Sequence, residues 1–385
     1  MQKQAFWNDP RYRAWFFQVL AILLVGGFFA TIAVNTIDNL RALNVASGFG
    51  FLQHTAGFGI SQTLIEYSEA STYGRAFLVA LLNTLLVAGI GIVFATVLGF
   101  LVGIARLSSN WLVAKLATVY IEIFRNIPLL LQILFWYTAV LSNLPAPRDS
   151  MQFGGMLLNK RGLYAPAPTG EPGFEYVMLA FAVALLGIII LRRLSERKRM
   201  NTGIGLPVLF PGLGLVFGVP LLVFWLAGSP LHFEVPELRG FNFVGGLRAS
   251  PELLALVFAL SIYTASFIAE IVRSGIQAVN WGQSEAALAL GLRRPEVLRL
   301  VVVPQALRVI IPPLTSQFLN LTKNSSLAAA LAYPELASVF AGTVLNQTGQ
   351  AIEVLAITMA VYLSLSLLTS MAMNFYNSRI ALVER

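Results

Sequence analysis

The chain has 385 residues, of which 57% are hydrophobic and only 11% are charged, whereas soluble domains carry roughly a quarter charged residues. This composition excludes an ordinary soluble protein and predicts a polytopic membrane protein. The net charge of +8 does not indicate nucleic-acid binding, because membrane proteins gather Lys and Arg on their cytoplasmic segments.

Cysteine is absent from the sequence, which excludes disulfides, a thiol nucleophile and zinc–thiolate sites. The two histidines, His54 and His232, stand far apart and are interpreted as surface residues. The sequence therefore predicts no metal site.

The first predicted membrane helix covers 15–37, an uncharged run of 23 residues that follows Lys3, Arg11 and Arg13. It exceeds the ~7–15 apolar residues of a signal peptide and no small-residue cleavage site follows it, so we expect it to be retained. Further apolar runs predict spans at 76–105, 116–142, 175–191, 204–228, 252–272, 308–332 and 353–376. The predicted fold class is an all-α polytopic membrane protein with about eight transmembrane helices.

The distribution of cations predicts the orientation of these helices. With a cytoplasmic N-terminus, the inner segments carry 17 Lys and Arg residues and the outer segments 7, while Arg125 and Lys323 fall inside spans. Because cytoplasmic loops are enriched in Lys and Arg, both termini are expected in the cytoplasm. The basic run 192–199 is interpreted mainly as a topology anchor, with binding of anionic lipid head groups as the alternative.

Glycine and proline mark two of the predicted spans. Gly89, Gly91, Gly99 and Gly103 recur along the second span, which predicts close helix–helix packing there. In the third span, Pro128 removes a backbone donor and disfavours helical geometry at the preceding residue, which predicts a kink or a broken helix. Broken helices at membrane depth are typical of transport paths.

Charged side chains inside the predicted spans are the candidate functional residues of the membrane part. Each costs at least ~2.5–3.5 kcal/mol at bilayer depth, so such groups usually pair or line a cavity. Glu122 and Arg125, like Glu270 and Arg273, are three residues apart, which places each pair on one helix face. Lys323 is expected about 22 Å along the seventh helix, hence deep in the bilayer.

These residues are interpreted as the lining of a hydrophilic substrate path. A path with both signs of charge suits a zwitterionic substrate, whereas the alternative is that the charges only stabilise helix packing. The candidate path residues are Glu122, Arg125, Asn126, Glu270, Lys323, Asn324 and Ser325.

The long polar segment after the sixth predicted span, 274–307, is expected to be a protein-docking element on the cytoplasmic side. A short helix should end at Gly291, and Pro295 suits the first turn of a second short helix. Small side chains at Ala286 and Ala287 would let a partner approach closely. No nucleophile–base pair lies nearby, so a catalytic role is not expected.

This segment also carries a family pattern. Glu285-Ala286-Ala287, Gly291 and Pro304 have the spacing EAA-x3-G-x9-hydrophobic-x-hydrophobic-P, which resembles the signature loop of binding-protein-dependent ABC importer permeases. The valines at 301 and 303 replace the isoleucine and leucine that are usual there. The resemblance implies that the loop seats in a cleft of a nucleotide-binding subunit and transmits its closure. It makes Glu285, Ala286, Ala287, Gly291 and Pro304 the ATPase-coupling residues.

Other segments narrow the resemblance. The run EIFRNIPLLLQ at 122–132 is similar to the EFFRGTPLLVQ segment of polar amino-acid permeases, with Asn-Ile where many members have Gly-Thr. The likeness covers roughly 73–145 and 249–380, and the enlarged plan resembles the general L-amino-acid transporter permeases of Gram-negative bacteria. It implies a type I importer (MetI-like) permease core.

The chain is accordingly expected to have four parts. They are an N-terminal membrane helix with a periplasmic segment, the first part of the core, an insertion with two extra membrane helices, and the second part of the core with the coupling loop 274–307. Their boundaries are 1–72, 73–145, 146–248 and 249–385.

The resemblance implies a permease subunit, not an enzyme, that moves L-amino acids into the cytoplasm across the bacterial inner membrane. No GxxxxGK[ST] run is present, so no cofactor is expected here and ATP–Mg would be bound by a partner ABC ATPase dimer. The other expected partners are a second homologous permease subunit, a periplasmic amino-acid-binding protein and the lipid bilayer.

The alternative function is an ion-coupled secondary amino-acid transporter with Glu122 or Glu270 as its proton site. Such a transporter would predict inverted repeats with matching broken helices, and the sequence shows no such pattern. It would also leave the segment 274–307 without a role.

Overall fold

The computed structural model describes residues 10–42, 48–203, 205–240 and 242–380. The internal contacts divide the chain into two units, one of Met1–Ile133 with Leu256–Arg385 and one of Leu134–Ala255. The expected insertion at 146–248 lies within the second unit. The expected position of the two termini rests partly on residues 1–9 and 381–385, which are outside the described ranges.

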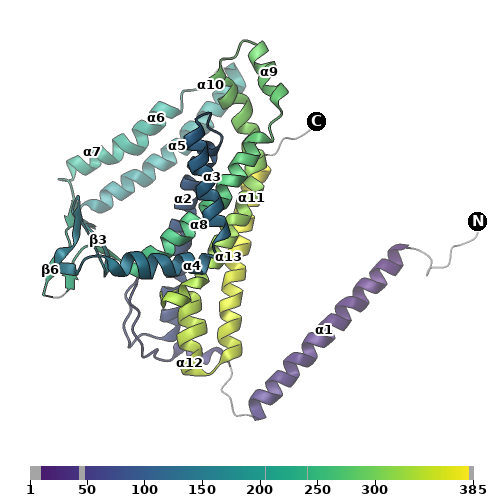
Figure 1. Cartoon of the computed structure of the whole chain (residues 1–385), viewed down its shortest axis with the longest axis vertical. Helices are drawn as coiled ribbons and strands as arrows, with labels where there is room; N and C mark the ends of the chain where they lie inside the picture. Colours follow the sequence, from purple (N-terminus) through teal and green to yellow (C-terminus); the bar gives the residue numbers. More distant parts are fainter. Residues whose placement is uncertain (1–9, 43–47, 204, 241, 381–385) are drawn as a thin grey trace, which may run out of the picture. The chain divides into compact units, whose positions relative to one another are not determined.

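Within the described ranges, seven helices are long and apolar enough to cross a membrane, and a bent pair gives an eighth span if it is counted as one. This confirms the predicted all-α membrane protein with about eight transmembrane helices (Figure 1). The long helices are α1 (Pro10–Ala42), α2 (Tyr73–Arg106), α5 (Phe174–Thr202), α8 (Pro251–Gln277) and α13 (Ala351–Ile380). Two further spans contain a π-helical stretch. The first consists of α6 (Leu209–Leu213), the π-helical η6 (Gly214–Gly218) and α7 (Val219–Leu226). The second consists of α10 (Arg294–Val297), the π-helical η7 (Leu298–Val302) and α11 (Val303–Asn324).

The third predicted span, 116–142, is broken at Pro128, which confirms the kink or break that the sequence predicts there. Helix α3 (Trp111–Asn126) ends just before Pro128, and α4 (Leu129–Leu134) begins just after it. The two arms, Trp111–Asn126 and Leu129–Asn143, are bent by 105°. The break follows from Pro128, because the preceding residue, Ile127, has the extended backbone that proline favours (φ −93°, ψ 128°).

The remaining helical elements are short. They are η2 (Phe49–Gln53), η3 (Phe135–Val140), η4 (Leu141–Asn143), η5 (Pro147–Asp149), α9 (Trp281–Ala289), η8 (Ser325–Leu331), η9 (Ala337–Val344) and α12 (Leu345–Thr348).

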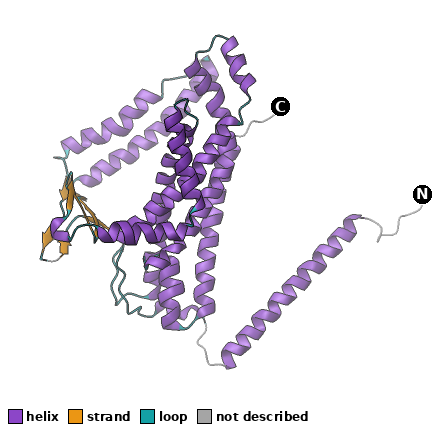
Figure 2. Ribbon diagram, in the orientation of Figure 1, coloured by secondary structure: helices purple, strands orange, loops and turns teal. Residues whose placement is uncertain are grey.

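The second unit contains β-strands that the all-α prediction lacked (Figure 2). Four strands form an antiparallel sheet in the order β1-β2-β3-β8, and two further pairs are β4 with β5 and β6 with β7. The strands are β1 (Met151–Phe153), β2 (Met156–Asn159), β3 (Gly162–Ala165), β4 (Ala167–Gly170), β5 (Leu231–Glu234), β6 (Glu237–Arg239), β7 (Asn242–Val244) and β8 (Leu247–Ala249). The pairs β3–β8 and β4–β5 join the two polar segments 143–174 and 229–250, which flank the two helical spans of this unit.

In the first unit, two glycines bring α2 and α8 into close contact. A Cβ atom at Gly99 would lie 2.6 Å from the Cβ atom of Ile268, and one at Gly103 would lie 2.7 Å from the carbonyl oxygen of Ala269. Only glycine therefore fits at these positions, which are four residues apart on one helix face. The predicted close packing of this span is confirmed there.

The other two glycines of α2 differ from each other. A Cβ atom at Gly91 would lie 3.2 Å from the side chain of Leu321 on α11, so this glycine also serves helix packing. Gly89 has no atom of the described residues within 4 Å of such a Cβ position. The prediction is therefore wrong for Gly89 alone.

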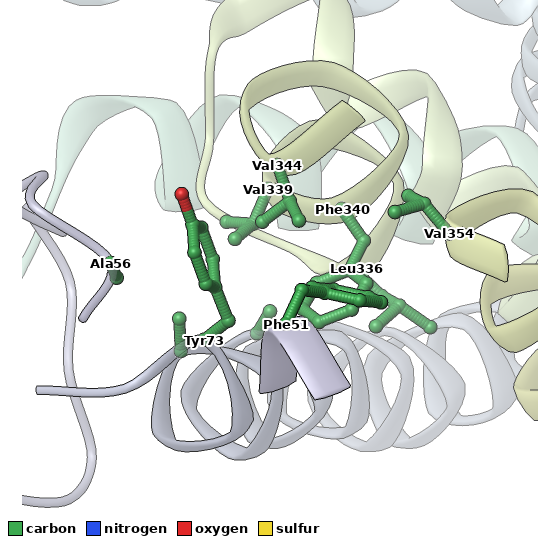
Figure 3. Packing of buried hydrophobic residues seen from close by; sticks show 10 residues of the cluster. Phe51, Ala56, Tyr73, Leu336, Val339, Phe340, Val344 and Val354 are labelled. Atoms are coloured by element: carbon green, nitrogen blue, oxygen red, sulfur yellow. The ribbon is translucent and has the colours of Figure 1, made fainter. Parts of the chain in front are cut away.

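Residues 48–72, here named the cap segment, pack on the helices of the first unit through a buried apolar cluster. The cluster comprises Phe51, Ala56, Tyr73, Ala76, Ala80, Leu336, Val339, Phe340, Val344 and Val354 (Figure 3). One polar contact of the cap segment reinforces it: the Gly48 N–H donates to Glu353 at 2.6 Å. The cap segment is thereby held in place without regular strands of its own.

Candidate functional site

The segment 274–307 forms the helical structure that its sequence predicts. Helix α9 starts after Asn280, whose side chain accepts a hydrogen bond from the Gly282 N–H at 2.8 Å. Such an N-cap satisfies a backbone donor that has no partner within the helix. Helix α9 covers the predicted helical stretch, which includes Glu285, Ala286 and Ala287.

Gly291 ends α9 in the way that the sequence predicts. Its φ of +84° is in the left-handed region, where a residue with a Cβ atom is strained. The Gly291 N–H donates to the carbonyl of Leu288 at 2.9 Å, and the Leu292 N–H donates to that of Ala287 at 3.2 Å. These two bonds are the pattern of a Schellman cap, which closes the last turn of the helix.

The two alanines of the family pattern have different environments. Ala287 is only 5% exposed and packs inside the segment, so the expectation that it offers a surface to a partner is wrong. Ala286 is exposed, as is Glu285, whose Oε1 accepts a hydrogen bond from Trp281 Nε1 at 2.8 Å. The carboxylate therefore has a preferred position on the exposed face of α9.

The segment also exposes large apolar side chains, which a polar solvent-facing loop does not need. Leu290 is 84% exposed and Trp281 is 74% exposed. The exposed large apolar side chains of the segment, together named the knob patch, are Trp281, Leu288, Leu290, Leu298, Leu300 and Val303. Several exposed large apolar side chains on one short segment are typical of a protein–protein contact.

The family-pattern residues alone do not predict the knob patch. A tryptophan at the start of α9 and a leucine directly before the terminating glycine were the available signals. Both side chains lie on a segment otherwise rich in polar residues.

The second helix of the segment does not end before the membrane span. It begins at Arg294, with Pro295 in its first turn as expected, and Glu296 accepts a hydrogen bond from the Arg293 N–H at 2.7 Å. It then continues through η7 into α11, so that Arg294–Leu331 counts as one candidate span. Pro304 is half-buried in the first turn of α11, directly after the π-helical stretch. Because a proline cannot donate to the preceding turn, the widened π turn fits its position.

Glu270 is at the centre of a charge cluster in the first unit. Arg273 Nη2 lies 2.5 Å from Glu270 Oε1, which confirms the pairing expected from the i,i+3 spacing. Arg106 at the end of α2 also forms an ion pair with Glu270, a contact that no spacing in the sequence predicts. All three side chains are about one quarter exposed, so the carboxylate is shared by two half-buried guanidinium groups. This arrangement fits the packing role that was the alternative for Glu270.

Glu122 and Arg125 are both exposed and do not form the expected ion pair within the described part of the chain. The guanidinium of Arg125 instead lies 5.1 Å from the ring centroid of Phe267 on α8, a cation–π distance. The exposed Asn126 donates from Nδ2 to the Glu122 carbonyl oxygen at 2.7 Å. These three candidate path residues therefore lie together at the end of α3, beside the break.

The three candidate residues on the seventh span have different degrees of burial. Lys323 is exposed near the end of α11, and Asn324 is half-buried. Ser325 is fully buried and donates to the Thr322 carbonyl at 2.7 Å, so its hydroxyl does not line a path in this structure. Lys323 and Asn324 stay candidates, whereas Ser325 is a core residue here.

One family model and several known proteins match most of this chain. The model of the family described as "Binding-protein-dependent transport system inner membrane component" matches residues 91–382. A protein of Escherichia coli K12 named YhdX is 57% identical over 379 residues, which is 98% of this chain and 96% of that protein. The general L-amino acid transport system permease protein AapQ of Rhizobium johnstonii is 56% identical over 98% of this chain and 94% of its own length.

A more distant relative also matches along its whole length. The glutamate/glutamine/aspartate/asparagine transport system permease protein BztB of Rhodobacter capsulatus is 42% identical over 98% of this chain and 96% of that protein. The similarity to these three proteins therefore includes the second unit as well as the first.

Proposed function

The chain belongs to the family of binding-protein-dependent transport system inner membrane components, and we propose from this that it is the permease subunit of an ABC importer that moves L-amino acids into the cytoplasm. AapQ and BztB, which are named as permease proteins of amino-acid transport systems, are similar over nearly the full length of both chains. Family membership also argues against the alternative of ion-coupled secondary transport.

The exposed structure of the segment 274–307 supports the proposal that this segment couples the chain to an ATPase. Helix α9 presents Glu285 and Ala286 beside the knob patch, and the Schellman cap at Gly291 fixes its end. Exposed apolar side chains beside a charged one are a surface that a protein partner can cover. The proposed partner is an ABC ATPase dimer, which supplies the energy that this chain has no P-loop to capture.

We assign three further features to the assembly by the same reasoning. The chain would pair with a second homologous permease subunit and receive its substrate from a periplasmic amino-acid-binding protein. It would lie in the bacterial inner membrane with both termini in the cytoplasm, because its cations are concentrated on the segments of that side.

The experiment that tests this function is ATP-driven uptake by the reconstituted complex. Proteoliposomes with the permease chains, the ATPase and the binding protein should accumulate labelled L-amino acids only when ATP is inside. Uptake driven by a pH gradient without ATP would contradict the proposal. Screening individual amino acids in the same assay would identify the substrates.

The knob patch predicts a specific loss of ATPase binding. Replacing Leu290 with aspartate should weaken co-purification of the ATPase at least about tenfold, since a charge in an apolar contact costs more than ~1.4 kcal/mol. Leu290 is 84% exposed, so the chain itself should fold normally. Met200→Asp is a matched control, because Met200 is 87% exposed and lies outside the patch. Equal ATPase binding by both variants would contradict the assignment.

We propose that the substrate path is lined by Arg125, Asn126, Lys323 and Asn324, together with Glu122. Glu270 supports this part of the chain through its two ion pairs.

Lys323→Gln should lower uptake at least about tenfold while the complex still assembles, because an exposed cation at membrane depth is costly unless it has a function. Lys323→Arg should keep more activity than Lys323→Gln. Unchanged uptake by the glutamine variant would remove Lys323 from the path.

A further inference from the structure

Gln132 on α4 is a buried polar residue at the break of the third span. It is 4% exposed, and its side chain turns back toward the end of α3. Its Nε2 donates to two carbonyl oxygens, those of Phe124 and Ile127, each at 3.0 Å. The two amide hydrogens of one side chain therefore satisfy two backbone acceptors on the other side of Pro128.

Both acceptors are left without a helical donor by the break. In an α-helix the Phe124 carbonyl would accept from the N–H of residue 128, but proline has none. The Ile127 carbonyl would accept from the N–H of Leu131, but this donor bonds to the Pro128 carbonyl at 3.1 Å instead. Gln132 thus replaces the donors that the break removes.

The orientation of the carboxamide follows from the same contacts. Gln132 Oε1 is buried and has no hydrogen-bond partner within the described residues. This side-chain oxygen therefore makes no contact that would fix the orientation of the carboxamide. A flipped amide would place Oε1 against two carbonyl oxygens and would lose both bonds. The donors of Gln132 therefore determine its position.

We propose that Gln132 is a positioning residue for transport, which holds the chain broken between Asn126 and Leu129. Unsatisfied carbonyls are strongly disfavoured where water is excluded, so without these donors the backbone would rearrange to satisfy them. The break carries Arg125 and Asn126 at the end of α3, and its rearrangement would move both. This inference rests on the proposed function, because it assigns these residues to the substrate path.

The first test compares Gln132→Leu with Gln132→Glu in the complete reconstituted complex. Gln132→Leu removes both donors and should lower uptake at least about tenfold, because it leaves two buried acceptors unpaired. A neutral glutamic acid can donate one hydrogen bond, whereas its ionised form donates none and is repelled by both carbonyls. Uptake by Gln132→Glu, relative to the unchanged protein, should therefore be highest at about pH 6 and fall toward about pH 8.

The second test uses proline itself. In a Pro128→Ala background, the restored N–H can bond to the Phe124 carbonyl, so Gln132 has less to replace. The Ile127 carbonyl still depends on Gln132 in that background, so adding Gln132→Leu should reduce uptake only about threefold, compared with the tenfold loss in the unchanged protein. Leu131→Met serves as the control, since Leu131 is on the same turn and is 56% exposed.

The outcomes separate this inference from the proposed function. If the unchanged complex imports amino acids but Gln132→Leu does so within about twofold of it, the positioning role is wrong and the function stands. A flat pH profile of Gln132→Glu, or equal losses with and without Pro128, would likewise overturn the role. If Gln132→Leu fails to fold, the pH profile of Gln132→Glu still decides. Failure of the unchanged complex to import would instead refute the proposed function.

Discussion

Replacing Gly103 with leucine should almost abolish the yield of folded protein. A Cβ atom at Gly103 would lie 2.7 Å from the Ala269 carbonyl oxygen and 2.8 Å from the Val272 Cβ atom, both on α8. The Ala269 carbonyl oxygen is a backbone atom, so it cannot rotate out of the way as the end of a flexible side chain can. Overpacking usually costs ~1–3 kcal/mol, and a separation of the two helices should place this variant at the upper end or beyond. Size-exclusion chromatography of the detergent-extracted chain and its thermal midpoint measure the effect.

Helix α2 itself supplies the control for this experiment. Gly89→Leu introduces the same side chain at an exposed position with no described atom within 4 Å of its Cβ, so the yield should stay near that of the unchanged chain. If Gly103→Leu and Gly89→Leu gave equal yields, the close contact between α2 and α8 would not be required for folding.

Replacing Gly291 with valine should uncouple ATP hydrolysis from transport. Gly291 has a φ of +84°, and the left-handed conformation costs roughly 1–2 kcal/mol for residues with a Cβ atom, with a further penalty for β-branching. The Schellman cap would open, and the end of α9 with Leu290 would lose its fixed position. We expect the amount of amino acid that the reconstituted complex takes up per ATP hydrolysed to fall at least about tenfold.

Asparagine at the same position separates backbone conformation from side-chain size. Asparagine adopts the left-handed conformation more readily than other residues, so Gly291→Asn should retain most of the coupling. Nothing within the described residues lies within 4 Å of a Cβ atom at Gly291, so the larger side chain has room. Normal coupling in Gly291→Val would contradict the role assigned to the cap.

The membrane helices and the coupling segment could be predicted from the sequence because their signals are local. A long apolar run needs no partner to be recognised, and a helix that ends at Gly291 is encoded by the glycine itself. The break at Pro128 is local in the same sense. These features agree with the structure, apart from the exact extent of each helix.

Features that depend on distant residues could not be predicted in this way. The strands of the second unit are only three or four residues long, too short for an alternating pattern, and β3 pairs with β8 from more than eighty residues away. The pairing of Arg106 with Glu270 joins two helices and has no sequence spacing to reveal it. The burial of Ala287 similarly depends on how α9 folds against the residues that follow it.

The continuity of α10, η7 and α11 has a mechanical consequence. From Arg294 to Asn324 this helix is about 45 Å long at 1.5 Å per residue. The knob patch lies at one end and Lys323 near the other, so a rotation at one end would displace the other like the arm of a lever. A tilt of about 10° about one end would displace the other by roughly 8 Å. Pro312 and Pro313 lie inside α11 and remove two neighbouring donors, which places a compliant joint partway along the lever. The bending stiffness at this proline pair would thus determine how much of a small rotation at the proposed ATPase contact reaches Lys323.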